Sequence, residues 1–242
     1  MPPARPALAA RLTTLLLPLL AVCLAARADV GGTLSWQSDA RDRGVSYTGG
    51  RPGAQLGLGW DGEAGWYAGA SLARVRLDAD RRSAWLRVYG GRVVELWPGL
   101  DVEAGLVVHR FGALSRYDFA EAYVGVLGER WSLRLHHAPD DYGSGQRSHY
   151  AEFNSRWPLA PRWAAVGHVG VLRGQGASRW PAQYVGAAHG PTRIEMRGGM
   201  SWQPGDSAEL QLAWVSASRG GPTMGADTGR RRAVVLGLTA AF

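Results

Sequence analysis

The sequence predicts a transmembrane antiparallel β-barrel of about twelve strands, and three observations support this fold class. The N-terminus has the pattern of an export signal, apolar and polar side chains alternate with a period of two, and tight turns alternate with longer connections. Strands with one apolar and one polar face can span a bilayer only when the sheet closes on itself, because every backbone polar group must be paired. We therefore expect a bacterial outer-membrane barrel with short periplasmic turns and longer outer loops.

Residues 1–28 have the composition of a cleaved signal peptide. Two arginines precede an apolar run over residues 15–24, and small residues at 26 and 28 form a signal-peptidase site. The apolar run is too short for a stable membrane span. We expect cleavage after Ala28, which leaves residues 29–242 as one barrel domain. The alternative is a lipoprotein modified at Cys23, but the valine before that cysteine is bulkier than the residue usually found there.

Composition narrows the possible functions further. Cys23 is the only cysteine and lies in the signal, so the mature chain has no disulfide and no thiol chemistry. The chain has a net charge of +7 and no lysine, and the mature part carries 24 arginines against 20 acidic residues. These arginines alternate with acids and form no basic stripe, which argues against nucleic-acid binding. No later segment approaches 18 consecutive apolar residues, so helical spans are not expected.

Alternation with a period of two is the main evidence for strands. Apolar residues at 100, 102, 104, 106 and 108 alternate with mostly polar ones, and the same pattern recurs at 194–202, 210–214 and 234–242. Most segments reach the length of about 9–11 residues that a tilted membrane strand needs. The twelve predicted strands are 33–45, 53–60, 65–76, 83–94, 99–110, 117–127, 130–138, 148–157, 162–172, 191–202, 207–217 and 231–242.

The connections between these segments fall into two kinds, and this predicts the orientation. The tight turns are at 61–64, 95–98, 128–129, 158–161 and 203–206. Between them fall mostly longer connections, at 46–52, 77–82, 111–116, 139–147, 173–190 and 218–230. In outer-membrane barrels the tight turns are periplasmic and the long loops are outside. An even number of strands then places both termini in the periplasm.

Tryptophans gather at the end with the tight turns. Indole prefers the membrane interface because it has an apolar body and one hydrogen-bond donor. A soluble β core would also use tryptophan, but it would not collect the rings at one rim. The predicted interface girdle, with Phe242 as a terminal aromatic assembly signal, is Trp60, Trp66, Trp97, Trp131, Trp157, Trp163, Trp202 and Phe242.

Several stretches resemble a family of exported proteobacterial proteins of unknown function, Gcw_chp. The segment 38–46, Ser-Asp-Ala-Arg-Asp-Arg-Gly-Val-Ser, is similar to the family's N-terminal pattern Ser-Asp-Tyr-x-Phe-Arg-Gly-Ile-Ser, with Ala40 and Asp42 in place of its aromatics. Residues 52–58 running into 65–69, then 121–126, 140–143 and 150–152, show further similarity. The resemblance covers about residues 33–172 and implies an outer-membrane barrel, but no particular chemistry.

If the apolar faces point to lipid, the opposite faces line the lumen. They carry both charge signs in similar number, so we expect either a salt-bridged plug or a narrow wet channel. Twelve strands lie between barrels filled by side chains and open porins. The predicted lumen-lining residues are Arg87, Asp101, Glu103, His109, Glu121, Tyr123, Arg134, His136, Glu152, Arg156, Arg193, Glu195, Arg197 and Glu209.

We find no catalytic, cofactor-binding or metal-binding motif in the sequence, and an enzyme is not expected. Ser148 and His149 are adjacent on a strand and must face opposite ways, as must His136 and His137. The first hypothesis is therefore a passive or weakly selective channel for small polar solutes, with the lipid bilayer and the outer-membrane assembly machinery as its partners. The alternatives are a closed barrel with a structural or surface-interaction role, and a lipid-modifying enzyme.

Overall fold

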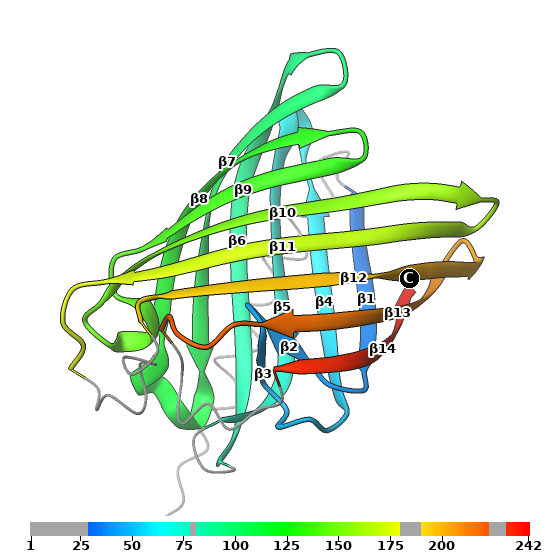
Figure 1. Cartoon of the computed structure of the whole chain (residues 1–242). Helices are drawn as coiled ribbons and strands as arrows, with labels where there is room; N and C mark the ends of the chain where they lie inside the picture. The colour runs from blue at the N-terminus through cyan, green and yellow to red at the C-terminus, as the bar shows by residue number, and fades with distance from the viewer. Residues whose placement is uncertain (1–28, 78–80, 180–189, 223–230) are drawn as a thin grey trace, which may run out of the picture.

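The computed structural model of the chain describes residues 29–77, 81–179, 190–222 and 231–242. Within these residues, twelve antiparallel strands form a closed barrel, which confirms the predicted fold class (Figure 1). The barrel strands are β1 (Asp29–Gln37), β4 (Gly53–Asp61), β5 (Trp66–Leu77), β6 (Arg81–Trp97), β7 (Leu100–Phe111), β8 (Phe119–Gly128), β9 (Trp131–Ala138), β10 (Arg147–Ala160), β11 (Trp163–Gln175), β12 (Thr192–Gly205), β13 (Ala208–Ala217) and β14 (Arg232–Ala241).

The remaining elements are short. Strands β2 (Arg41–Asp42) and β3 (Val45–Ser46) pair with each other in a separate two-stranded sheet. Three 3-10 turns, η1 (Glu63–Gly65), η2 (Gly112–Tyr117) and η3 (Asp141–Gly143), lie in connections between barrel strands. Within the described part of the chain, no helix is long and apolar enough to cross a membrane.

The barrel is a simple meander that closes between its first and last strands. Consecutive barrel strands pair in sequence order, and β14 returns to β1 with Leu34 opposite Ala240. Beyond the paired strands, the backbone amides and carbonyls of Gly32 and Phe242 exchange two hydrogen bonds, of 2.8 and 3.0 Å. The barrel therefore has no free edge strand.

Two of the predicted boundaries are wrong in an informative way. The strand predicted at 33–45 ends at Gln37, and the residues that follow turn away from the wall to form β2 and β3. Part of the loop predicted at 77–82 is strand, because β5 extends to Leu77 and β6 begins at Arg81. Residues 78–80, much of the outer loops at 173–190 and 218–230, and the predicted signal peptide 1–28 lie outside the described residues.

The outward face is apolar on every strand of the barrel. Leu106, Leu212 and Val234 are 63 %, 56 % and 65 % exposed, although they lie within regular strands. Exposed apolar side chains on all sides of a closed sheet are the surface that a bilayer covers. Of the predicted girdle, Trp66, Trp97, Trp157, Trp163, Trp202 and Phe242 are exposed, and Trp60 and Trp131 are partly exposed.

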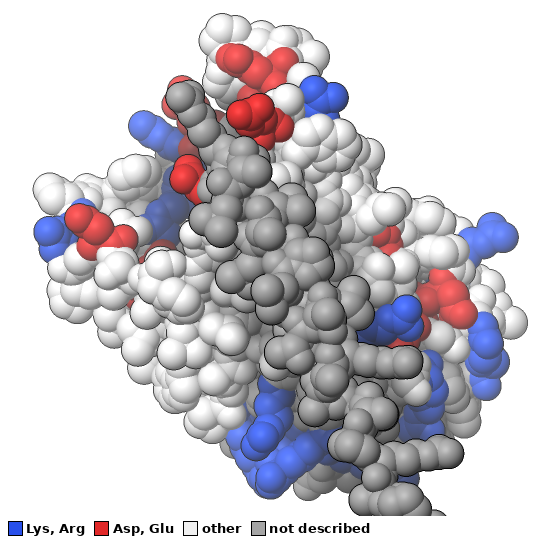
Figure 2. Space-filling model, turned by 180° about the vertical axis from the view of Figure 1, so that it is seen from behind, with Lys and Arg blue, Asp and Glu red and all other residues white. Residues whose placement is uncertain are grey.

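Charged residues differ between the two ends of the barrel. Exposed arginines such as Arg51, Arg81 and Arg82 lie at the end with the longer connections, whereas exposed acids such as Asp61 and Glu63 lie at the tight turns. Figure 2 shows one face, with a group of arginines at the lower end and with acids and further arginines above. We call the end with the longer connections the outer end.

Candidate functional site

The segment that joins β1 to β4 folds back into the barrel as a hairpin. Arg43 and Gly44 form its turn, both with positive φ (48° and 76°), as tight two-residue hairpin turns require. Asp39, which is 6 % exposed, holds the base of the hairpin. Its carboxylate accepts a hydrogen bond from Arg41 Nε at 2.7 Å and another from the Ser46 hydroxyl. We call residues 39–48 the inner hairpin.

The tip of the inner hairpin contacts the far wall of the barrel. Arg43 Nη2 donates a hydrogen bond of 2.6 Å to Glu121 Oε2 on β8, and its guanidinium lies 4.4 Å from the ring centroid of Tyr150 on β10. Gly44 lies so close to β13 that a Cβ atom there would be 2.5 Å from the Cβ of Ala217. In the ring order, β8 and β10 are each five strands from β1, so the inner hairpin crosses the lumen.

A second arginine fixes the turn from the outer end. Arg193 on β12 is 2 % exposed, and it donates to the carbonyl oxygen of Arg43 at 3.3 Å and to that of Pro222 at 2.7 Å. It therefore ties the hairpin turn to the segment that follows β13. Among the predicted lumen residues, Arg193 thus contacts backbone rather than an acidic partner.

Aromatic residues fill the outer end of the lumen beside the hairpin. The Tyr47 and Trp85 rings pack edge to face with centroids 4.8 Å apart, and the hydroxyl oxygens of Tyr47 and Tyr142 are 2.5 Å apart. This outer aromatic cluster brings η2 and η3 over the mouth of the barrel. Its buried members are Tyr47, Val75, Trp85, Phe111, Leu114, Tyr117, Phe119, Ala138 and Tyr142.

An acid is buried next to this cluster. Asp141 in η3 is 0 % exposed, and neither of its carboxylate oxygens has a hydrogen-bond partner among the described residues. Burial raises the pKa of Asp141 to about 7, although Arg43 and Arg193 nearby favour the ionised form. This turn therefore contains an acid whose pKa is shifted toward neutral pH by burial.

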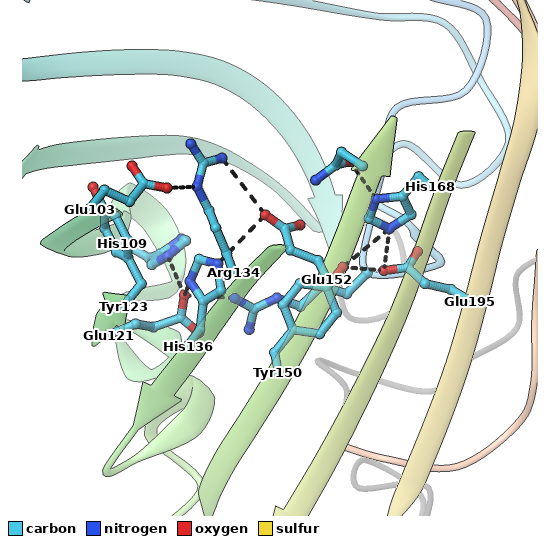
Figure 3. A network of polar contacts seen from close by, with 12 residues as sticks. Glu103, His109, Glu121, Tyr123, Arg134, His136, Tyr150, Glu152, His168 and Glu195 are labelled. Carbon is cyan, nitrogen blue, oxygen red and sulfur yellow. Dashed lines mark hydrogen bonds and ion pairs between the residues drawn. The ribbon is translucent and has the colours of Figure 1, made fainter. Parts of the chain in front are cut away.

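Deeper in the lumen, acids, histidines and arginines form a connected polar network (Figure 3). His136 lies between two carboxylates, with Nδ1 3.6 Å from Glu121 Oε2 and Nε2 3.6 Å from Glu152 Oε1. Arg134 lies 3.9 Å from Glu152 and also donates a hydrogen bond to Glu103. Each of these acids therefore faces a basic side chain, which offsets the cost of burying it.

The network continues across β10 to β12. Glu195 accepts a hydrogen bond of 2.7 Å from the Tyr150 hydroxyl, and its Oε1 is 3.4 Å from His168 Nε2 (Figure 3). On its other side, His168 Nδ1 is 2.7 Å from the amide oxygen of Asn154. The acids of the network stand on β7, β8, β10 and β12, so they occupy one side of the barrel.

The described residues enclose two adjoining cavities inside the barrel. The larger, of about 650 Å³, adjoins the polar network. The smaller, of about 230 Å³, lies between the inner hairpin and the wall of β1, β4, β5 and β6. Arg41, Asp42, Arg87 and Arg197 line both cavities, so the two adjoin across the hairpin.

Most of the predicted lumen residues line the larger cavity. Glu103 and Arg134 form an ion pair, Arg193 holds the hairpin, and Arg156 pairs with Glu209 at 2.8 Å. Within the described part of the chain, the Asp101 side chain makes no hydrogen bond or ion pair, and it shares the inward face of β7 with Glu103 by alternation. The predicted residues that line the larger cavity are Arg87, His109, Glu121, Tyr123, Arg134, His136, Glu152, Glu195 and Arg197.

Other residues of the site were not predicted as its members. His168 was missed because both faces of β11 carry apolar residues, such as Val166 inside and Val169 outside, so the alternation gives no inward face. Tyr67 was missed because small residues follow it on the same face of β5. Its hydroxyl lies 3.0 Å from Glu103 Oε2.

The structure places the serine and histidine pairs considered from the sequence on opposite faces of their strands. Ser148 is 1 % exposed and faces inward, whereas His149 is exposed on the outer face. His137 stacks on His149 outside at 4.7 Å, while His136 faces the lumen. Among the described residues, no three His, Cys, Asp or Glu side chains are grouped so that they could hold a metal ion.

Residues 25–209 match the Gcw_chp family, described as a bacterial protein of unknown function. The chain belongs to this family. The match extends past the region 33–172 that showed the resemblance, and it includes the whole inner hairpin. Arg43 and Gly44, which resemble the Arg-Gly pair of the pattern quoted in the sequence analysis, are the two residues of the hairpin turn. A comparison with curated proteins finds no match.

Solved structures of outer-membrane porins share the fold. The NanC porin superposes with a TM-score of 0.58 at 12 % identity, over 88 % of this chain and 99 % of that one. The KdgM porin superposes with a TM-score of 0.52 at 8 % identity, over 89 % and 99 %. The structure of the KdgM porin in complex with disordered oligogalacturonate superposes with a TM-score of 0.51 at 10 % identity. It covers 89 % of this chain and 99 % of that chain. This Gcw_chp protein thus has the closed β-barrel fold of outer-membrane porins.

Proposed function

We propose that the barrel is a narrow, weakly selective channel for small polar solutes. The observation that carries the proposal is the pair of adjoining polar cavities, of about 650 and 230 Å³, inside a closed barrel whose outer face is apolar. A lumen lined by arginine, glutamate, histidine and tyrosine side chains favours water and polar solutes over lipid. The KdgM porin, which has the same fold, has been solved with oligogalacturonate, and this agrees with a lumen that admits polar solutes.

The inner hairpin makes the proposed channel narrow, because it occupies part of the lumen. A barrel of twelve strands is wider than one filled by its own side chains, yet here a segment of the chain crosses the lumen. Both charge signs line what remains, so we propose weak rather than strong ion selectivity.

The test is conductance of the purified protein in planar bilayers. We expect small discrete steps after insertion, with uptake of small sugars by vesicles that contain the protein. Insertion is verified separately, by the shift in gel mobility on heating that folded barrels show. Verified insertion without any conductance or uptake would overturn the channel and favour the closed structural barrel.

A further inference from the structure

The boundary between the two cavities has an unusual composition. Of the four residues that line both cavities, three are arginines, Arg41, Arg87 and Arg197, and the fourth is Asp42. We call these three arginines the arginine row. Asp42 accepts a hydrogen bond of 3.3 Å from the Tyr47 hydroxyl. A solute that passes from one cavity to the other must pass the arginine row.

The arginine row extends across the lumen. Arg87 stands on β6 and Arg197 on β12, and in the ring of twelve these strands are six apart in either direction, so they are opposite each other. Arg41 belongs to the inner hairpin, which lies between the two walls. All three side chains border the same passage beside the hairpin.

Two of these arginines have no acidic partner. Among the described residues, Arg197 makes no hydrogen bond or ion pair, and it is partly exposed to the lumen. Arg87 donates only to the Ser71 hydroxyl, at 3.2 Å, and its guanidinium lies 4.9 Å from the centroid of the Trp85 ring. Arg41 differs, because it forms an ion pair with Asp39.

The acids of the lumen compensate this charge only in part, because Asp42 is the one acid that lines both cavities among the described residues. Glu121 is held by Arg43, and Glu103 by Arg134. The described wall of the smaller cavity on β1, β4 and β5 contributes no acid toward the hairpin. It carries neutral residues, among them Ser35, Gln37 and Gln55, together with Arg74. Acids and bases are therefore paired within the larger cavity, whereas the guanidinium groups of Arg87 and Arg197, which lack acidic partners, lie where the two cavities adjoin.

Unpaired guanidinium groups in a confined polar space favour a specific ligand chemistry. The planar donor fork of arginine matches the two oxygens of a carboxylate better than it matches a neutral solute. The smaller cavity, of about 230 Å³, has room only for a small molecule. Local positive charge at a constriction also raises the concentration of anions there.

We propose that the arginine row is an anion-binding site on the solute path and that it selects small organic acids through their carboxylate group. This inference rests on the proposed channel function and names its preferred solute class. Arg87 and Arg197 supply the unpaired guanidinium groups, and Arg41 positions the hairpin edge of the site.

The test is the reversal potential across bilayers that contain the protein, in gradients of potassium chloride and potassium lactate. The wild type passes both anions in preference to potassium. The double variant Arg87→Gln/Arg197→Gln lowers the anion-to-cation permeability ratio by roughly twofold or more, because the local positive charge is gone. Arg156→Gln/Glu209→Gln is the matched control, since it also replaces two charged lumen side chains by glutamine but removes an ion pair and so leaves the net charge unchanged. That control leaves the ratio close to the wild-type value.

The outcomes separate this inference from the channel itself. Conductance with an equal ratio in the Arg87→Gln/Arg197→Gln variant and the wild type overturns the anion site and leaves the channel intact. A preference for chloride with no lactate permeation overturns the carboxylate assignment. Absence of conductance in verified insertions overturns the channel, and the inference falls with it. Heat-dependent gel mobility of each variant shows that it folds.

Discussion

Arg43 and Glu121 form the buried ion pair that holds the inner hairpin across the lumen. They are 78 residues apart in sequence, and their side chains are 8 % and 1 % exposed. Each also has a polar atom without a partner among the described residues, Nη1 of Arg43 and Oε1 of Glu121. Each of these two buried charges is stabilised by the other, because little water reaches the site. Removal of one side chain therefore leaves the other as an uncompensated buried charge.

Glu121→Gln should release the inner hairpin. The change leaves the Arg43 charge buried beside a neutral amide, and breaking a buried pair in this way costs about 3–5 kcal/mol. We expect trypsin, added from outside to protein in vesicles, to cut after hairpin arginines in the variant but not in the wild type. Glu209→Gln is the control, because its pair with Arg156 is 29 % and 40 % exposed and contributes about 0–1 kcal/mol. Equal protection of both variants would contradict a holding role for this pair.

Asp141 should make the stability of the loop at residues 139–146 depend on pH. Its pKa in the folded loop is about 7 against an ordinary value of 3.8, so the folded state favours the protonated acid. Stability of the loop is then highest at low pH, falls as pH rises between these two values, and changes little above about 7. Hydrogen exchange in residues 139–146, corrected for the intrinsic effect of pH, should report this loss.

Asp141→Asn should remove that dependence and slow exchange at about pH 8 relative to the wild type, since the amide cannot ionise. The histidines and Glu121 nearby remain in the variant, so they cannot account for the difference. Asp140→Asn is the matched control, because Asp140 is partly exposed and pairs with Arg179 at 2.9 Å. A variant at 141 that keeps the wild-type profile would show that another group titrates.

At the level of elements, the barrel strands could be predicted from sequence because their environment is periodic. Lipid on one side and a polar lumen on the other impose alternation on each strand, as Leu133 and Leu135 show beside Arg134 and His136. The inner hairpin has no such environment. Residues 38–45 continue the polar pattern of β1, so the sequence favours one long strand where the chain turns inward.

The partners within the site could not be predicted for the same reason. Alternation gives the face of a residue and therefore placed Glu121, His136 and Arg197 on the inward side. It does not give the distance between strands that are far apart in the ring. The contact of Arg43 with Glu121 depends on the path of the hairpin, which local periodicity does not contain.

Gly44→Ala should displace the inner hairpin. The alanine Cβ would lie 2.5 Å from Ala217 and 3.1 Å from Glu195 Cβ, on a backbone with φ of 76°. We expect larger conductance steps, because a displaced hairpin leaves more of the lumen open. Gly50→Ala is the matched control, since its φ is 74° and nothing lies within 4 Å of its Cβ position. The control carries the same backbone strain without the collision. Equal conductance in the two variants would mean that the hairpin does not limit the channel.

For the whole molecule, function depends on the contrast between two faces of one closed sheet. The apolar face is continuous around all twelve strands, whereas the polar face is divided by the inner hairpin. Two neighbouring positions on any strand therefore face opposite environments, one toward lipid and the other toward the lumen. The same substitution at neighbouring positions should consequently have opposite effects.

Leu212→Arg and Gln211→Arg test this contrast in the middle of β13. Leu212 is 56 % exposed on the outer face, and an arginine facing the bilayer midplane costs about 2–4 kcal/mol. Gln211 lines the larger cavity, where an arginine meets water and the carboxylates of the lumen. We expect Leu212→Arg to lower the urea midpoint of unfolding in vesicles and Gln211→Arg to leave it nearly unchanged, because only the first places a charge in hydrocarbon. Gln211→Arg should also raise the anion-to-cation permeability ratio, since it adds positive charge to the solute path. The reverse order of stabilities would mean that the faces of the barrel are exchanged, with the polar network toward lipid and the leucines inside.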